Sequence, residues 1–328
     1  MKPGLILVAP TIADQIAAAR HAEARGFDSV WTIEFFNMNG FVRLAAVAAA
    51  TSRVKLGTGI AYAFMRTPLL ASGAAMDIDE LSGGRMILGL GSGTRSMNER
   101  WYSVRFDDPP APRMREAVAL VRAAIAAQKG GGLRFDGKYY KIDIPQYSRP
   151  AAPRAEIPIY VAAVNRGMIR AAAACADGLV GHPIYTRKYI REHVLPELAG
   201  TKCALAPYVM CSVSDDVDQA RREVRAQIGF YYSTKLYHTV LDAHGWRGVG
   251  EEIASAFKRG DFAAMAKAVP DELVDEIGIA GRPDEARDRL RQWQGLTEQP
   301  LLYAATVGAP PGRVRENLAA ISDTFGTR

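Results

Sequence analysis

Two short stretches of the sequence combine glycine with hydroxyl, amide or guanidinium groups, and both directly follow an apolar run. Gly91-Ser92-Gly93-Thr94 comes after residues 86–90, and Asn165-Arg166-Gly167 comes after residues 157–163. Glycine lets a backbone N–H approach a ligand closely, and the first N–H groups of a helix attract anions. Both stretches are therefore candidate phosphate sites. A glycine-rich junction of this kind is more often a plain tight turn.

A carboxylate and several aromatic side chains accompany other apolar runs. Glu34 directly follows residues 28–33, and it serves there either as a catalytic group or as a paired structural acid. The nearby aromatic residues are Trp31, Phe35, Phe36, Tyr62 and Phe64. Such side chains suit either core packing or the binding of a flat heteroaromatic ligand. His182, after residues 178–181, is suited to bind phosphate or transfer a proton, and is also compatible with a hydrogen-bonded surface position.

The sequence lacks the motifs of several other enzyme classes. It contains no His-Glu-x-x-His, no Gly-x-Ser-x-Gly and no P-loop, so metalloprotease, serine hydrolase and NTPase functions have no support. Its three cysteines, Cys175, Cys203 and Cys211, form no Cys-x-x-Cys pair, and we expect buried reduced thiols and no metal site. His244-Gly245-Trp246 could form part of a lid, although packing explains it as well.

Eight short apolar runs alternate with amphipathic helical segments along the chain. The runs are Gly4–Ala9, Asp28–Ile33, Val54–Ile60, Met86–Leu90, Ile157–Ala163, Gly178–Gly181, Ala204–Val213 and Leu301–Ala305. This alternation in 328 residues predicts an α/β fold, namely a (β/α)8 TIM barrel with insertion segments. An open doubly wound sheet would need Gly-x-Gly-x-x-Gly after its first strand, where this chain has Ala9-Pro10-Thr11.

We expect a single domain over residues 1–328, because no low-complexity linker interrupts the pattern. Two segments depart from the alternation. Residues 133–142 alternate around Asp136-Gly137, which predicts a hairpin, and residues 231–276 predict a helical insertion. In a barrel, the active site lies at the carboxyl ends of the strands and in the loops that follow them. The candidate residues named above would therefore meet at one mouth.

Charge and hydropathy argue against two classes of partner. The formal net charge is +6, but Lys and Arg are spread along the chain without a basic stripe, so we expect no nucleic acid partner. The first apolar run is far too short for a signal core or a membrane span, and no longer run follows. These patterns predict a cytoplasmic protein that acts on a small-molecule substrate without a membrane partner.

Three segments, in order along the chain, carry a resemblance to a known family. The first is Val54–Ile60 followed by Arg66-Thr67-Pro68, and the second is Asp77–Arg85 leading into Leu88-Gly89-Leu90-Gly91-Ser92-Gly93. The third is Ile157–Ala163 followed by Ala176-Asp177-Gly178. Together they resemble the bacterial luciferase-like oxidoreductases, which have the TIM-barrel fold.

Within that superfamily the sequence is most similar to the F420-dependent methylenetetrahydromethanopterin reductase-like enzymes. Segments of the C-terminal half add to this resemblance, and they are Cys211–Asp216, Gly260-Asp261-Phe262 and Gly281–Glu285. The resemblance implies that coenzyme F420, an 8-hydroxy-5-deazaflavin, binds across the strand ends. It also implies a homodimer formed through helices near the second and third strands, where Phe41–Ala50 is apolar enough to bury a partner.

The resemblance assigns cofactor-binding roles to ten positions. It implies a non-prolyl cis peptide between Gly59 and Ile60, whose bulge backs the deazaflavin ring, and a phosphate near Asn165. The expected cofactor-binding residues are Gly59, Ile60, Ala61, Gly93, Ala163, Val164, Asn165, Arg166, Gly167 and His182. For catalysis we expect Glu34 to orient the ring or the substrate, and Tyr62 or Thr94 to donate a proton.

Three positions depart from the pattern of the relatives. Alcohol-oxidising members place an Asp-His pair after the second strand, whereas this chain has Glu34-Phe35, and phenylalanine cannot act as a base. The reductases carry a glutamate in the first strand and an acid after the fourth strand, and Ile6 and Thr94 stand at these positions. The cofactor scaffold is thus retained while the proton-handling groups differ, so we do not expect the reductases' pterin as substrate.

Three functions follow from these observations. The leading hypothesis is an oxidoreductase that transfers a hydride between F420 and an unidentified small organic substrate. The alternative is an FMN-dependent luciferase-like monooxygenase, which would use reduced flavin and oxygen. The third is a non-catalytic barrel that binds or stores the cofactor, because the acid and histidine positions are changed.

Overall fold

The computed structural model describes residues 1–149 and 154–327, and the contacts between them divide the chain into two compact units. The central unit consists of Ser29–Val180 with Gly200–Ala204. The terminal unit consists of Met1–Asp28, Gly181–Ala199 and the chain from Leu205 onward. Each unit alternates strands with helices, as the sequence pattern predicts.

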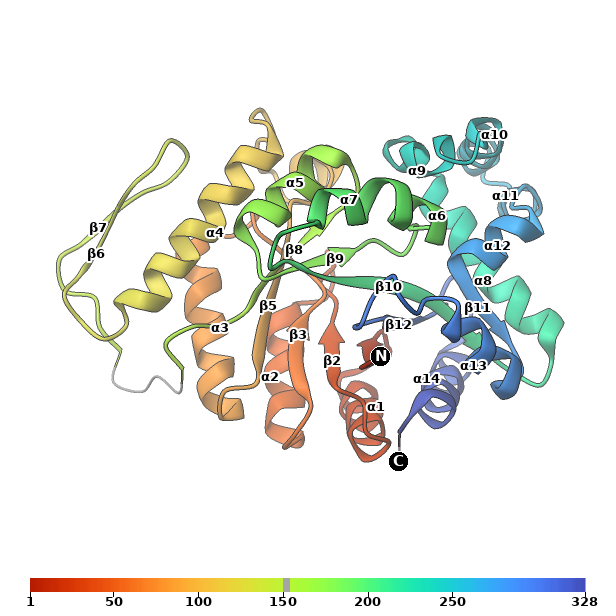
Figure 1. The fold of residues 1–328 in the computed structure, drawn as a ribbon, viewed down its shortest axis with the longest axis horizontal. Helices are drawn as coiled ribbons and strands as arrows, with labels where there is room; N and C mark the ends of the chain where they lie inside the picture. Colours follow the sequence, from red (N-terminus) through yellow and green to blue (C-terminus); the bar gives the residue numbers. More distant parts are fainter. Residues whose placement is uncertain (150–153, 328) are drawn as a thin grey trace. The chain divides into compact units, whose positions relative to one another are not determined.

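The central unit contains a sheet with the strand order β2-β3-β5-β8-β9, and its register is parallel from β2 to β8 (Figure 1). The strands are β2 (Ser29–Thr32), β3 (Lys55–Thr58), β5 (Met86–Gly91), β8 (Ile159–Ala163) and β9 (Gly178–Gly181), with the short β4 (Ala61–Tyr62) paired to β5. The helices are α2 (Gly40–Ala50), α3 (Pro68–Ser82), the π-helical turn η1 (Met97–Trp101), α4 (Pro110–Ala127) and α5 (Arg166–Cys175).

A two-stranded hairpin runs alongside α4 in the central unit (Figure 1). Strand β6 (Leu133–Asp136) pairs antiparallel with β7 (Lys141–Ile144), which confirms the predicted hairpin. Its turn is anchored by Glu116 of α4, whose carboxylate accepts hydrogen bonds from the backbone N–H groups of Lys138, Tyr139 and Tyr140.

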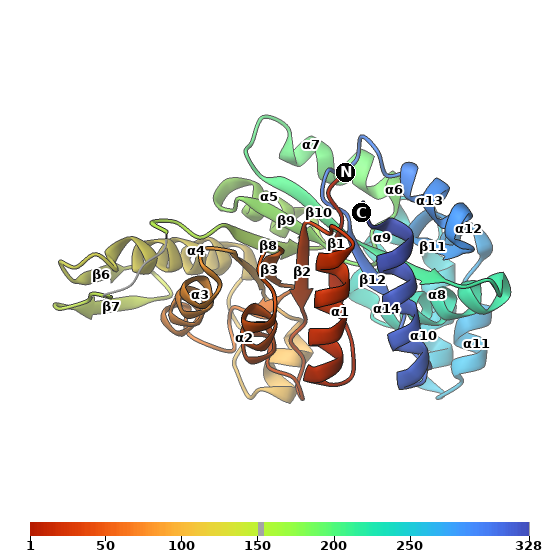
Figure 2. The same ribbon diagram turned by 90° about the horizontal axis from the view of Figure 1, so that it is seen from below.

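The terminal unit contains the strand order β11-β10-β12-β1, also with parallel register. The strands are β1 (Gly4–Leu7), β10 (Ala204–Val213), β11 (Gly278–Gly281) and β12 (Leu301–Ala304). The helices are α1 (Ile12–Ala24), α6 (Arg187–Tyr189), η2 (Ile190–Val194), α7 (Leu195–Leu198), α8 (Val217–Tyr232), α13 (Pro283–Arg291) and α14 (Pro311–Phe325). Helices α1 and α14 lie side by side (Figure 2), where Asp323 is hydrogen-bonded to His21 and forms an ion pair with Arg25 of the α1 segment.

Residues 231–276 contain the end of α8 and a series of short helices. These are η3 (Lys235–Tyr237), α9 (His238–Asp242), α10 (Arg247–Lys258), α11 (Phe262–Lys267) and α12 (Asp271–Ile277). The segment is tied to its neighbours by charge, because Asp275 of α12 accepts hydrogen bonds from Arg221 of α8 and Arg289 of α13. The description of this segment as an insertion within one domain stays a prediction.

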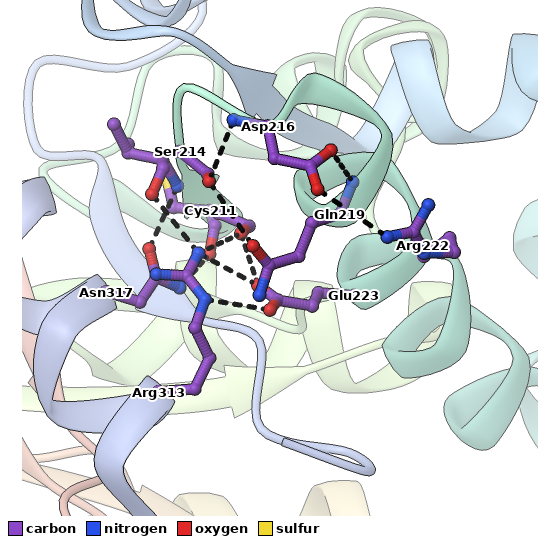
Figure 3. Close-up of polar contacts among 10 residues, drawn as sticks. Cys211, Ser214, Asp216, Gln219, Arg222, Glu223, Arg313 and Asn317 are labelled. Atoms are coloured by element: carbon purple, nitrogen blue, oxygen red, sulfur yellow. Dashed lines mark hydrogen bonds and ion pairs between the residues drawn. The ribbon is translucent and has the colours of Figure 1, made fainter. Parts of the chain in front are cut away.

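The motif Cys211–Asp216 joins β10 to helices α8 and α14 (Figure 3). Asn317 of α14 donates to the carbonyl of Cys211 and accepts from the N–H of Val213, which fixes the end of the strand. Arg313 donates to Glu223 of α8 and to the Val213 carbonyl. The motif therefore has a structural role, and burial raises the pKa of the Cys211 thiol, which keeps it protonated and inert.

The Ser82-Gly83-Gly84-Arg85 turn fastens the start of β5 to the end of α2. Gly83 ends α3 in the left-handed conformation, with φ of 67°. The Arg85 guanidinium then donates to the carbonyls of Ala48, Thr51, Val54 and Ser82 and to the Thr51 hydroxyl, at 2.8–3.1 Å. All five donors of the side chain are used.

We expect Arg85→Lys to lower the free energy of unfolding by about 3 kcal/mol, because an ammonium group cannot reach carbonyls on several sides at once. Urea denaturation measures the change. Arg134→Lys, at an exposed hairpin position, is the matched control and should change stability by less than about 0.5 kcal/mol. Equal stability of the two variants would contradict the role given to Arg85.

Candidate functional site

A bulge separates two paired segments at the junction of β3, β4 and β5. Leu56 and Gly57 pair with Met86 and Ile87, whereas Ala61 and Tyr62 pair with Leu90 and Gly91. Three residues, 58–60, therefore lie opposite two residues, 88–89, so the segment between β3 and β4 contains one extra residue, which forms a bulge. The peptide bond between Gly59 and Ile60 is cis, as the family resemblance implies.

Glycines of β5 make room for this bulge. A Cβ on Gly89 would lie 1.9 Å from the carbonyl oxygen of Thr58, and one on Gly91 would lie 2.6 Å from Cδ1 of Ile60. The Thr58 hydroxyl replaces the missing ladder bonds, because it donates to the Gly89 carbonyl at 2.8 Å and accepts from the Gly89 N–H at 2.9 Å. The two glycines of the Leu88-Gly89-Leu90-Gly91 motif are thus explained by the close approach of the bulge to β5.

Glu34, which follows β2, is anchored to the segment after the bulge. Its Oε2 accepts from the Tyr62 N–H at 2.9 Å and from Nη1 of Arg66 at 2.7 Å, and its Oε1 accepts from Nη2 of Arg66 at 2.6 Å. The Glu34 side chain is 6% exposed and that of Arg66 22%, so the ion pair is largely shielded from water. The Arg66 guanidinium also lies over the Phe41 ring, 4.9 Å from its centroid.

The next two residues of the motif begin a helix. Thr67 accepts a hydrogen bond from the Leu70 N–H as N-cap of α3, and Pro68 occupies its first turn. The Arg66-Thr67-Pro68 motif therefore joins an ion pair to a helix start. Glu34 holds β4 in place through this arrangement, while its predicted role toward a substrate stays a prediction.

The loop after β5 is held by a buried amide. Asn98, which is fully buried, donates through Nδ2 to the carbonyls of Ser92 and Thr94, at 2.9 Å each. Its Oδ1 is buried and has no hydrogen-bond partner among the described residues. Thr94 accepts from the Met97 N–H, and Gly93 is in the left-handed region with φ of 65°. Sequence reasoning missed Asn98, because a single asparagine in a charged run carries no local signal of burial.

Tyr102 is a second residue that the sequence did not reveal. Its ring packs against that of Tyr62 with 5.8 Å between centroids. Burial and then the Glu34 carboxylate raise the pKa of its phenol, and Arg66 opposes the shift. Tyr102 therefore stays protonated at neutral pH, close enough to the Glu34–Arg66 pair to feel its charges, and can donate a hydrogen bond or a proton.

The predicted phosphate segment runs from the end of β8 into the first turn of α5. Ala163 is buried at the strand end and Val164 is partly buried, whereas Asn165, Arg166 and Gly167 are exposed. The Asn165 side chain caps α5 by accepting from the Met168 N–H, and its Oδ1 would lie 3.6 Å from a Cβ added at Gly167. Because Gly91 lies against Ala162 of β8, this segment and the loop after β5 lie side by side in the central unit.

His182 belongs to the terminal unit and is surrounded by tyrosines. Its ring centroid lies 4.4 Å from that of Tyr237 and 5.0 Å from that of Tyr231. Its Nδ1 accepts a long hydrogen bond of 3.4 Å from the Ile184 N–H, which leaves Nε2 to carry the proton. Burial lowers the pKa of His182 to about 3, so it is a neutral hydrogen-bond donor and not a general acid at neutral pH.

The shifted pKa of His182 predicts a specific loss of stability in acid. Between its ordinary pKa of 6.5 and about 3 the unfolded chain binds a proton that the folded chain does not, so the free energy of unfolding falls as the pH drops through this range. From pH 7 to pH 5 the loss from this one group should be about 2 kcal/mol. Urea denaturation at both pH values should show the loss in wild type and in the exposed control His193→Asn, but not in His182→Asn. An unchanged loss in His182→Asn would refute the assignment.

In the described residues, no group of three or more His, Cys, Asp and Glu side chains is placed to hold a metal ion. Within the same ranges, no helix combines the length and the hydropathy needed to cross a membrane.

Known proteins similar to this chain share its length and its fold. The sequence profile of luciferase-like monooxygenases matches residues 2–298. An uncharacterized protein of Mycobacterium tuberculosis is 34% identical over 90% of this chain and 93% of its own. A 5,10-methylenetetrahydromethanopterin reductase of Archaeoglobus fulgidus is 30% identical, covering 83% of each.

A solved structure extends the comparison to three dimensions. The coenzyme F420-dependent tetrahydromethanopterin reductase from Methanopyrus kandleri matches 98% of this chain and 97% of its own, with a TM-score of 0.82 and 22% identity. The fold is thus the (β/α)8 TIM barrel predicted from the alternating pattern.

Proposed function

The chain belongs to the luciferase-like monooxygenase family, and on that premise we propose that it is an oxidoreductase that transfers a hydride between coenzyme F420 and a small organic substrate. The observation that carries the proposal is the bulge at residues 58–60, seated on Gly89 and Gly91 beside the exposed start of α5. A relative from Mycobacterium tuberculosis that is named as a putative coenzyme F420-dependent oxidoreductase, 29% identical to this chain, supports the choice of cofactor.

The residues present fit a flat ring that carries an anionic tail. The bulge offers backbone and uncharged side chains at Gly59, Ile60 and Ala61, and glycines of the neighbouring strand leave room for Ile60. The α5 N-terminus offers N–H groups that lack intrahelical partners by its geometry, next to the exposed Arg166. We therefore assign the ring to the bulge and the phosphate to Asn165, Arg166 and Gly167, with Gly93, Ala163 and Val164 alongside in the same unit.

When bound, F420 supplies the carbon that carries the hydride. The chain's own groups hold the site in position and supply a proton to the substrate. The Glu34–Arg66 pair fixes β4 and so holds Tyr62 in position. Three hydroxyls of the central unit can donate a proton to a substrate, those of Tyr62 and Thr94, as predicted from sequence, and that of Tyr102. Phe35 stands where alcohol-oxidising relatives carry a base, and Ile6 is fully buried on β1, so neither transfers a proton.

Fluorescence titration of apoprotein with F420 and with FMN tests the proposal. We expect saturable quenching of F420 fluorescence, and Arg166→Ala should weaken F420 binding about tenfold through loss of a charged contact to phosphate. The control Arg134→Ala, on the hairpin, should bind as wild type does. Tight FMN binding with no F420 binding would contradict the proposal.

The second candidate is an FMN-dependent monooxygenase, which the description of the family profile favours. Such an enzyme would consume oxygen with reduced FMN, whereas a reductase would turn over reduced F420 without oxygen. If the protein turned over neither reduced FMN nor reduced F420, the remaining hypothesis would be a non-catalytic barrel that binds the cofactor.

We also propose a homodimer formed through α2 and α3. Val42 and Leu70 on these helices are 60% and 67% exposed and offer apolar surface that a second copy could bury. Sedimentation of wild type and of a Val42→Glu variant tests this: the variant should be monomeric.

A further inference from the structure

Three aromatic side chains of the central unit form a cluster that stays open to solvent. The rings of Phe35, Phe36 and Trp101 contact one another, with centroids 4.6 Å apart for Phe35–Phe36, 5.3 Å for Phe35–Trp101 and 5.5 Å for Phe36–Trp101. Phe36 is 61% exposed and Trp101 46%. We call this cluster the aromatic platform. Contiguous exposed apolar surface of this kind marks a binding site more often than chance.

Both segments that carry the platform are held in fixed conformations. Phe35 and Met38 exchange two backbone hydrogen bonds, and Asn39 then caps α2. Trp101 ends the π-helical turn η1, in which the N–H of Tyr102 reaches the Met97 carbonyl. The turn is anchored from within by the buried Asn98.

Backbone strain accompanies the second segment. Ser103, directly after Tyr102, has φ of 56° and is the only non-glycine residue with positive φ in the described ranges. Isolated π-turns and left-handed non-glycine residues both concentrate at functional sites, because their cost persists only where the surroundings fix them. The conformation of this loop therefore fixes the position of the Trp101 ring.

The platform is continuous with the candidate active site. Phe35 directly follows Glu34, whose carboxylate binds Arg66 and the Tyr62 N–H. Trp101 directly precedes Tyr102, whose ring packs on Tyr62. Two chain segments thus lead from the platform to the same residue, Tyr62, and both follow the carboxyl ends of strands, where barrel enzymes bind substrates.

We propose that the aromatic platform binds the substrate, and that this substrate is a neutral, flat, unsaturated or aromatic molecule. The three rings themselves offer stacking faces and edges but no charge and, apart from the indole N–H, no hydrogen-bond donor. A charged substrate would find no partner for its charge on these rings, whereas a flat apolar ring would bury its surface against them. The inference rests on the proposed oxidoreductase function and specifies its substrate class.

Binding of 2-naphthol, a neutral bicyclic arene, tests the proposal by equilibrium dialysis. Phe36→Ala and Trp101→Ala should each weaken binding about tenfold, and Trp101→Phe should restore most of it, since a ring face is retained. Phe262→Ala removes an equally exposed ring, 59% exposed, from the terminal unit and should bind as wild type does. Urea denaturation of each variant confirms that it is folded.

Several results would overturn the proposal. One is no binding of 2-naphthol to wild type; another is equal binding by all variants. A change from dimer to monomer in Trp101→Ala, seen by sedimentation, would make the platform an interface between copies. If Phe36→Ala and Trp101→Ala weakened F420 binding as much as they weaken 2-naphthol binding, the platform would be assigned to the cofactor. Titration of F420 on the same samples separates the two proposals: if wild type binds no F420 but binds 2-naphthol through the platform, the oxidoreductase proposal fails and the platform stands.

Discussion

Replacing Gly89 with alanine is expected to lower the free energy of unfolding by about 3 kcal/mol or more and to abolish F420 binding. The added methyl group would lie 1.9 Å from the Thr58 carbonyl oxygen, and backbone cannot move aside as a flexible side chain can. Relief requires shifting residues 58–60, which breaks both bonds of the Thr58 hydroxyl to Gly89. Urea denaturation and fluorescence titration measure the two effects.

Gly73→Ala is the matched control. Gly73 lies in α3 of the same unit, and nothing stands within 4 Å of its added Cβ. This variant should gain about 0.5–1 kcal/mol, because alanine favours a helix over glycine. If Gly89→Ala were as stable as wild type, the bulge could not be seated against β5 as described.

Replacing Glu34 with glutamine should lower the free energy of unfolding by about 3 kcal/mol, because it leaves the guanidinium of Arg66 without its charge partner in a shielded place. The hydride-transfer rate should fall roughly tenfold or more, since the Tyr62 segment loses its anchor. Stopped-flow measurement of F420 oxidation would report the rate, and urea denaturation the stability.

A double-mutant cycle distinguishes the pair from a general packing effect. Arg66→Met should cost a similar amount, and the double variant Glu34→Gln/Arg66→Met should cost clearly less than the sum. The exposed Arg95–Glu99 pair is the control, and Glu99→Gln should change stability by less than about 0.5 kcal/mol. Additive effects of Glu34→Gln and Arg66→Met would exclude the coupling.

The sequence predicts those parts of the site that depend on backbone conformation. Gly89 and Gly91 can be recognised in the chain because only glycine leaves space for the bulge, and Thr67-Pro68 because a cap and a proline start a helix in a regular way. By contrast, the pairing of Glu34 with Arg66 joins residues 32 positions apart, and no local pattern encodes it. The burial of Asn98 and the approach of Tyr102 to Tyr62 are likewise products of folding.

Strands with a local apolar pattern were predicted, whereas a strand that depends on pairing was not. All eight apolar runs became strands, because each is short, buried and bounded by turn residues. Strand β11 was missed, since Gly-Ile-Ala-Gly has little β propensity and forms only by pairing with the end of β10. Residues 187–198 do not form one continuous α-helix, because residues 190–194 are π-helical just before Pro196, whose ring cannot supply an N–H to a regular turn.

The five bonds of Arg85 have a consequence for how this enzyme can be changed. They lock the start of β5 to the end of α2, whereas the loops at residues 34–38 and 92–104 follow the opposite, carboxyl ends of β2 and β5. Stability and recognition are thus assigned to different ends of the same strands. Libraries that randomise those two loops, sparing Glu34 and Asn98, should yield mostly folded proteins, which makes the scaffold a practical start for evolving oxidoreductases with new substrates.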